Sequence, residues 1–140
     1  MKMYEIVGLS YTGFQGLKIN ETGEEMKKIL ILEDSESLLK IWEIFFKTQA
    51  CEFVSCSNLE AAFEALNTAD HLDILLCDYT IHGETSLDFC KSAREKFPTA
   101  RIELITGFDK DDIDAEIDDS LNLNFSTKPV PMAFLSSLIK

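Results

Sequence analysis

The stretch Ile29-Leu30-Ile31-Leu32-Glu33-Asp34 is an apolar run that ends in two acids. A short continuous apolar run is typical of a strand that is covered on both faces in a parallel sheet. Three later runs follow the same plan: residues 74–77 precede Asp78, residues 102–105 precede Thr106, and residues 124–127 precede Lys128. Because the carboxyl ends of parallel strands open on one edge, where ligands bind, we expect these polar residues to meet in one pocket.

From residue 27 onward, apolar periodicity alternates between strand and helix. Strands are expected at 28–33, 52–56, 72–78, 101–106 and 123–126, and helices at 35–48, 58–66, 85–97, 109–120 and 131–140. Ser35 or Asp34 is suited to cap the first helix, and Asn58 the second. Short connections and right-handed crossovers then predict a doubly wound α/β sandwich with five strands and five helices, in one domain of residues 27–140.

Residues 1–26 differ in composition and form an N-terminal extension that holds four of the six glycines. Residues 4–11 have strand character and Thr12-Gly13 is a turn signal, so a small hairpin is expected. The alternative is that Met26 is the natural start, because the codons of Gly23-Glu24-Glu25 resemble a ribosome-binding site. Both interpretations stay open at this point.

Composition limits the class of partner. The 140 residues carry 25 acids and 13 bases, a net charge of −12, which repels phosphate backbones and argues against nucleic-acid binding. No apolar run approaches the roughly 20 residues of a membrane span, and no secretory signal is visible, so we expect a cytoplasmic protein away from membranes. Cys51, Cys56, Cys77 and Cys90 lie in or beside apolar runs and are expected to be reduced core thiols, rather than metal ligands or disulfides.

The residues at the predicted sheet edge suit phosphoryl transfer. The carboxylates of Glu33, Asp34 and Asp78 repel one another unless a cation joins them, and Mg²⁺ prefers such oxygen ligands. Beside the cation, the Asp78 carboxylate is a nucleophile that accepts a phosphoryl group. Lys128 supplies an ammonium and Thr106 a hydroxyl for the phosphoryl oxygens, and Gly107 leaves the entry open.

On these residues the chain resembles the receiver domains of two-component response regulators. Spacings of 44, 28 and 22 residues separate Asp34, Asp78, Thr106 and Lys128, and they fit that family over residues 27–140. The resemblance implies the flavodoxin-like strand order 2-1-3-4-5 and phosphotransfer from a sensor kinase phosphohistidine to Asp78 with Mg²⁺.

The resemblance also implies individual roles. Asp34 and Asp78 would ligate the metal directly, Glu33 through water, and Thr80 through its backbone carbonyl. When Thr106 moves to the phosphate, Phe125 would swing inward and reshape the face formed by the fourth helix, the fifth strand and the fifth helix, which biases a two-state equilibrium.

The segment after Asp78 departs from the family. His82 stands where the family usually has Pro, and Ser86 where it usually has Gly, so the loop geometry is expected to differ. His82 either approaches the pocket and modulates the phosphoryl lifetime or is an exposed loop imidazole. Phe108, two residues after Thr106, is a further candidate, because it would shield the phosphate from water.

The expected helix at 109–120 is strongly acidic. Seven acids and one lysine occupy residues 109–119. One interpretation is a solvated acidic face, and the other is an output surface for a basic partner.

The sequence therefore predicts a stand-alone receiver that signals through protein contacts and is no enzyme beyond intrinsic Mg²⁺-dependent autophosphorylation and autodephosphorylation. Its expected partners are a sensor histidine kinase or phosphotransfer protein and an unidentified downstream protein. The alternative is a receiver-like adaptor that acts by docking without phosphorylation. A hydrolase acting on small phosphates is disfavoured, because Thr80 stands where a second catalytic acid would be needed.

Overall fold

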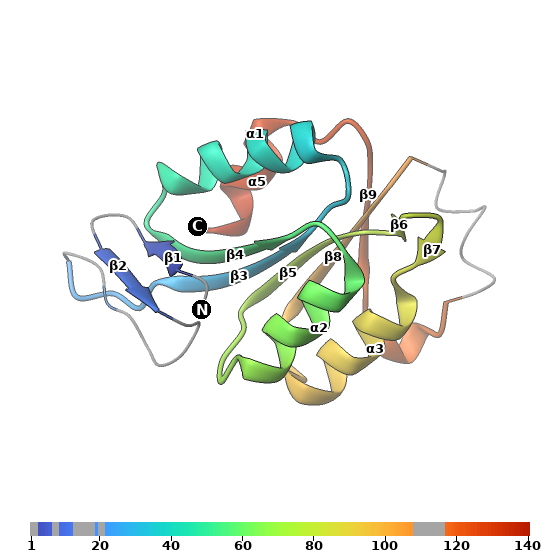
Figure 1. Ribbon diagram of the computed structural model, residues 1–140. Coiled ribbons are helices and arrows are strands. Elements are labelled where there is room, and N and C mark those ends of the chain that lie inside the picture. The colour runs from blue at the N-terminus through green and yellow to red at the C-terminus, as the bar shows by residue number, and fades with distance from the viewer. Residues whose placement is uncertain (1–2, 7–8, 13–18, 20–21, 108–116) are drawn as a thin grey trace.

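The computed structural model describes residues 3–6, 9–12, 19, 22–107 and 117–140 (Figure 1). The strands in these ranges are β1 (Met3–Ile6), β2 (Leu9–Thr12), β3 (Lys27–Leu32), β4 (Cys51–Cys56), β5 (Ile74–Asp78), β6 (Thr80–Ile81), β7 (Glu84–Thr85), β8 (Arg101–Thr106) and β9 (Asn124–Thr127). The helices are α1 (Glu36–Lys47), α2 (Leu59–Thr68), α3 (Leu87–Lys96), the 3₁₀ helix η2 (Asp119–Leu121) and α5 (Met132–Leu138).

Five parallel strands are adjacent in the sheet, in the order β4-β3-β5-β8-β9, with β9 at the edge. In chain order these are the second, first, third, fourth and fifth of the predicted strands, so the flavodoxin-like order is confirmed. Their bounds lie within two residues of the predicted ones. The largest difference is at β5, which begins at Ile74 rather than at residue 72.

The N-terminal strands extend this sheet beyond β4. β1 and β2 pair antiparallel with Ile6 opposite Leu9, and β1 also pairs antiparallel with β4 through Ile6 and Glu52. The expected hairpin is therefore present, but Thr12 lies in β2 rather than in a turn, and Gly13 lies outside the described residues. The chain reverses between Ile6 and Leu9, because Met3–Ile6 and Leu9–Thr12 are two paired strands rather than one continuous strand.

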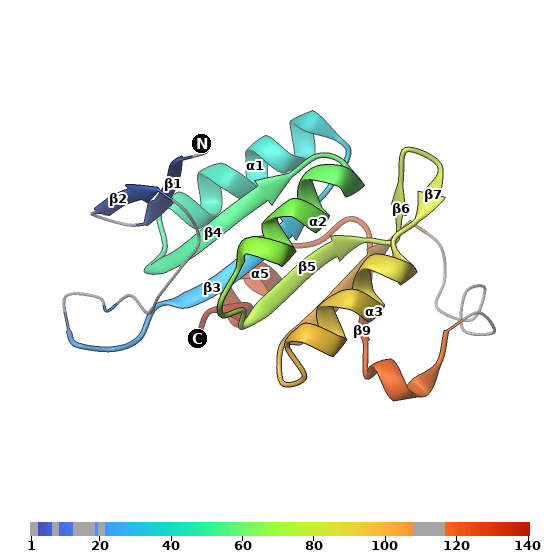
Figure 2. The ribbon, with the colours of Figure 1, turned by 60° about the horizontal axis from the view of Figure 1, so that its bottom comes forward.

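Helices cover both faces of the sheet (Figure 2). On one face α1 and α5 pack against a core that includes Trp42, Phe46 and Leu135. On the other face α2 and α3 pack against a second core that includes Leu66 and Phe89. The central strands are buried on both sides, as their continuous apolar sequence predicts.

Local capping begins two of the helices where the sequence places their starts. The Ser35 hydroxyl accepts the Leu38 N–H at 3.4 Å, and the Asn58 side chain accepts the Ala61 N–H at 2.8 Å. Each cap satisfies one of the N–H groups that a helix leaves unpaired at its first turn.

The described residues include only the last part of the predicted helix at 109–120, from Ile117 onward. Residues 109–116, with most of the acidic segment, lie outside the described residues, as does Phe108. Within the described part, Ile117 and Asp118 are not helical, so the prediction is wrong there. Asp118 has an extended backbone, and its carboxylate accepts the Ser120 N–H at 2.9 Å to begin η2.

All four cysteines lie among the described residues, and each is a buried free thiol, as predicted. The part of the chain that the structure describes contains no helix that is long and apolar enough to cross a membrane.

Candidate functional site

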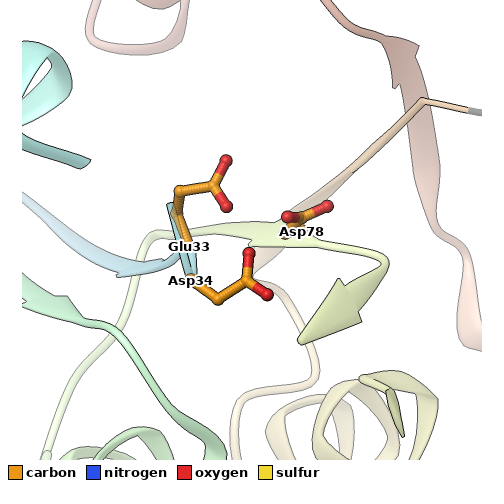
Figure 3. Close-up of side chains that lie close together, drawn as sticks. All are labelled: Glu33, Asp34 and Asp78. Carbon is orange, nitrogen blue, oxygen red and sulfur yellow. The ribbon is translucent and has the colours of Figure 1, made fainter. Parts of the chain in front are cut away.

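Three carboxylates meet at the carboxyl edge of the sheet (Figure 3). Glu33 and Asp34 directly follow β3, and Asp78 is the last residue of β5, the strand that pairs with β3. Each of the three offers one oxygen, and these oxygens lie within 4.8 Å of one another. Glu33 and Asp78 are buried, whereas Asp34 is half-buried.

Lys128 forms ion pairs with two of these carboxylates. It directly follows β9, and its Nζ donates to Glu33 Oε1 at 2.8 Å and to Asp78 Oδ2 at 3.0 Å. The other oxygen of Glu33 accepts the Ser35 N–H at 3.2 Å. The sequence separations of 95 and 50 residues are therefore bridged by direct ion pairs, as the common strand edge predicts.

Burial and neighbouring charge shift the pKa values of this cluster. Burial, reinforced by the neighbouring Asp78 carboxylate, raises the pKa of Glu33 to about 7, although Lys128 acts in the opposite direction. Burial lowers the pKa of Lys128, but its hydrogen bonds to Glu33 and Asp78 outweigh this and raise it above its ordinary value. The pKa of Asp34 is lowered, because hydrogen bonds outweigh the opposing effect of desolvation; the N–H of His82 makes the largest of these contributions.

The donor set suits a hard divalent cation. Carboxylate oxygens from three residues converge, and one lysine does not balance three negative charges. Mg²⁺ binds through such carboxylates and keeps several waters, so it needs neither a closed cage nor softer ligands. Glu33, Asp34 and Asp78 therefore fit the cation that the sequence analysis predicts at this edge.

The other predicted residues lie around the cluster. Thr106 ends β8 and is buried, and its carbonyl accepts the Lys128 N–H at 2.8 Å. Gly107 is exposed, and a Cβ at this position would meet no atom of the described residues within 4 Å. Phe125 lies opposite Leu104 in the β8–β9 pairing and is half-buried. Thr80 begins β6, two residues after Asp78.

A short hairpin that the sequence analysis did not predict follows Asp78. β6 and β7 pair antiparallel around His82 and Gly83. His82 is exposed, as one alternative expects, and its main-chain N–H donates to Asp34 Oδ2 at 2.8 Å, so the main chain rather than the imidazole reaches the pocket. Ser86 donates its hydroxyl to the Asp78 carbonyl at 2.7 Å, instead of capping α3. The only sequence signal for this contact is a hydroxyl at a position where the family usually has Gly.

A comparison with protein-family models matches residues 29–140 to the response regulator receiver domain. The chain belongs to that family. The matched range contains every residue of the site, from Glu33 to Lys128. A comparison with curated protein sequences gave no match.

Solved receiver structures share this fold. A receiver domain protein from Clostridium thermocellum matches with a TM-score of 0.70 at 18% identity, over 81% of this chain and 91% of its own. A CheY-like receiver domain protein from Methanospirillum hungatei matches with a TM-score of 0.71 at 15% identity, over 80% and 89%. A response regulator from Burkholderia pseudomallei, solved with a phosphorylated aspartic acid, a calcium ion and citrate, matches with a TM-score of 0.69 at 15% identity, over 81% and 66%. At these identities the likeness establishes the fold.

Proposed function

We propose that this receiver domain accepts a phosphoryl group on Asp78, with Mg²⁺, from the phosphohistidine of a sensor kinase or phosphotransfer protein. The observation that carries the proposal is the surroundings of the Asp78 carboxylate. It ends a rigid buried strand, lies within 4.8 Å of the Glu33 and Asp34 carboxylate oxygens, and has the Lys128 ammonium at 3.0 Å. The Asp78 carboxylate, two further acids and a lysine ammonium are thus combined in one site.

The chemistry follows from these groups. One Asp78 oxygen attacks phosphorus, and a new O–P bond forms while the bond from phosphorus to the histidine nitrogen breaks. The nitrogen keeps the electron pair. Bound Mg²⁺ would neutralise charge on the phosphoryl oxygens as a Lewis acid. Lys128, which now shares its ammonium between Asp78 and Glu33, would exchange the Asp78 oxygen for a phosphoryl oxygen.

The relative from Burkholderia pseudomallei supports this assignment, because it carries a phosphorylated aspartic acid and a calcium ion in one structure. Asp78 ends the third parallel strand in chain order, next to the acids that follow β3.

The output is proposed to pass through protein contacts on β9 and α5. Thr106 and Phe125 lie on the paired strands β8 and β9, so a movement of Thr106 toward phosphate would change the space next to the half-buried Phe125. Phosphorylation would shift the equilibrium between the two conformations only by the difference in free energy with which they hold the phosphoryl group. A downstream protein that binds this altered face would read the signal.

The test is the intact mass of the full chain after incubation with acetyl phosphate and Mg²⁺, beside Asp78→Asn. We expect one added phosphoryl group in the wild type, and none in the variant or when Mg²⁺ is left out. Beryllofluoride binding, followed by NMR, covers the case of a phosphoryl group that hydrolyses before it is measured.

Failure of both measurements would overturn the phosphoacceptor function and favour an adaptor that acts by docking alone. Phosphorylation that persists in Asp78→Asn would instead move the acceptor to another residue.

A further inference from the structure

The hairpin that follows Asp78 has a backbone that the usual receiver sequence cannot adopt. β6 and β7 pair with Ile81 opposite Glu84, so His82 and Gly83 are the two residues of the turn. Both have positive φ, 49° and 82°. Positive φ at both central residues is the requirement of a type I′ hairpin turn, and histidine tolerates it better than most side chains. Proline, with φ held near −65°, cannot occupy the first position.

The hairpin is tied to the site at its tip. The His82 N–H donates to Asp34 Oδ2 at 2.8 Å, and Nε2 of the same residue lies 3.1 Å from the Ser57 carbonyl oxygen, where it donates because a carbonyl only accepts. A proline has no N–H, so the contact with Asp34 needs both the turn conformation and a residue other than proline. Since Asp34 is only half-buried, this N–H restricts a carboxylate that packing alone does not hold.

The hairpin is also tied at its base. The Ser86 hydroxyl donates to the Asp78 carbonyl at 2.7 Å and lies 3.2 Å from the Tyr79 carbonyl, which also accepts the Ser86 N–H at 2.9 Å. Ser86 is completely buried. These bonds hold the main chain between Asp78 and Thr80, and a glycine would lack the hydroxyl.

From these contacts we infer that His82 and Ser86 are positioning residues for divalent-cation binding at Asp34 and Asp78. The N–H of His82 holds one oxygen of the Asp34 carboxylate, which belongs to the cluster with Glu33 and Asp78, and Ser86 fixes the main chain that carries Asp78. The two departures from the family pattern thus act as a pair: each supplies a donor that the usual residue lacks. This inference rests on the proposed Mg²⁺-dependent function.

The test is the Mg²⁺ affinity of the full chain, measured by calorimetry on the wild type, His82→Pro and His82→Gly. His82→Pro removes the N–H and forbids the turn, whereas His82→Gly keeps both and removes only the ring. We expect Mg²⁺ binding to weaken about tenfold or more in His82→Pro, the scale of a lost hydrogen bond to a charged group, and to stay within about threefold in His82→Gly.

Asn122→Pro is the matched control. Asn122 has φ of 51° and is, with His82, one of the two non-glycine residues with positive φ among those described. It precedes β9, whereas Lys128 follows that strand, so it lies toward the opposite edge of the sheet. The control carries the same backbone conflict and is expected to lose stability without losing Mg²⁺ affinity once folded.

A second variant keeps the inference testable if His82→Pro does not fold. Ser86→Ala removes the hydroxyl alone, and we expect it to bind Mg²⁺ about three- to tenfold more weakly, as befits the loss of a neutral hydrogen bond. Urea unfolding without Mg²⁺ measures stability separately, since a merely structural role would lower stability and leave the affinity of the folded protein unchanged.

The outcomes separate the two proposals. If the wild type binds Mg²⁺ and both His82→Pro and Ser86→Ala bind it with the same affinity, the positioning role is overturned and the proposed function stands. Equal losses in His82→Pro and His82→Gly overturn the assignment to the N–H. A wild type that binds no Mg²⁺ at millimolar concentration overturns both proposals.

Discussion

Two buried glutamates at opposite edges of the sheet have different surroundings. Glu33 follows β3 at the carboxyl edge, and Glu52 is the second residue of β4, near the amino edge, opposite Lys28. Both side chains are 0% exposed. Burial raises the pKa of both, to about 7 for Glu33 and to about 8 for Glu52, where Asp70 adds to the effect.

Glu33 and Glu52 differ in their hydrogen bonds. Glu33 accepts from Lys128 at one oxygen and from Ser35 at the other. Neither oxygen of Glu52 has a hydrogen-bond partner among the described residues. Lys28 lies opposite Glu52 in the β3–β4 pairing, and its Nζ donates to Asp70 at 3.4 Å. The two carboxyl groups are equally buried but differ in their hydrogen bonds. Removing a neighbouring residue or a proton is therefore expected to change the stability of the protein differently at the two positions.

The two edges of the sheet differ in how their buried carboxyl groups are compensated. At the carboxyl edge, Lys128 pairs with Glu33 and Asp78, and the negative charge that remains unbalanced there suits a cation. At the amino edge, the buried Glu52 carboxyl group has no hydrogen-bond partner among the described residues, and burial favours its protonated form.

The largest expected loss of stability is that of Lys128→Met. It leaves the buried carboxylates of Glu33 and Asp78 without their ammonium, and we expect the free energy of unfolding at pH 8 to fall by about 2–3 kcal/mol, less than for a completely buried pair because Lys128 is 28% exposed. Urea unfolding at pH 8 and pH 5 measures the loss, which is expected to be smaller at pH 5, where Glu33 binds a proton in the folded state.

Lys40→Met, at an exposed position of α1, is the control for losing a lysine. A loss of equal size at both pH values in Lys128→Met would contradict the charge argument.

Glu52→Gln tests the other carboxyl group. Because the pKa of Glu52 is raised from 4.5 to about 8 on folding, the folded state binds the proton more tightly than the unfolded state. Stability from this group is therefore complete below about pH 4.5 and is lost as the pH rises toward 8, with a slope of up to about 1.4 kcal/mol per pH unit. We expect the stability of Glu52→Gln relative to the wild type to increase between pH 5 and pH 8, as measured by urea unfolding.

The exposed Glu95→Gln on α3 is expected to show no such trend. A constant difference between Glu52→Gln and the wild type over this pH range would show that Glu52 titrates normally.

Asp70→Asn has the smallest expected effect. Asp70 is 53% exposed, and its charge is the second contribution to the raised pKa of Glu52, after burial. Removing the charge is expected to lower the pKa of Glu52 by a fraction of a unit, without returning it to the ordinary value. NMR titration of the Glu52 side-chain carboxyl measures this shift, and an upward shift would contradict the repulsion.

Much of this protein is predictable from local patterns. Continuous apolar runs predict buried parallel strands, and Ser35 and Asn58 mark the starts of α1 and α2 through the N–H groups they accept. The convergence of Asp34, Asp78 and Lys128 is predictable too, because parallel strands place their carboxyl ends on one edge. The reversal between Ile6 and Leu9 was missed, because short strand-forming segments do not specify where a hairpin turns.

The sequence by itself determined the order of strands and helices, the buried character of the sheet and the family, since these follow from periodicity and from motifs at fixed spacings. Only the tertiary structure decided that the N–H of His82 reaches Asp34, 48 residues away, and that Glu52 is buried with no hydrogen-bond partner in the described part of the chain. Such contacts depend on where main-chain donors and side chains lie in three dimensions. A backbone N–H is present at almost every residue, so the sequence carries no mark of the ones that reach a functional group.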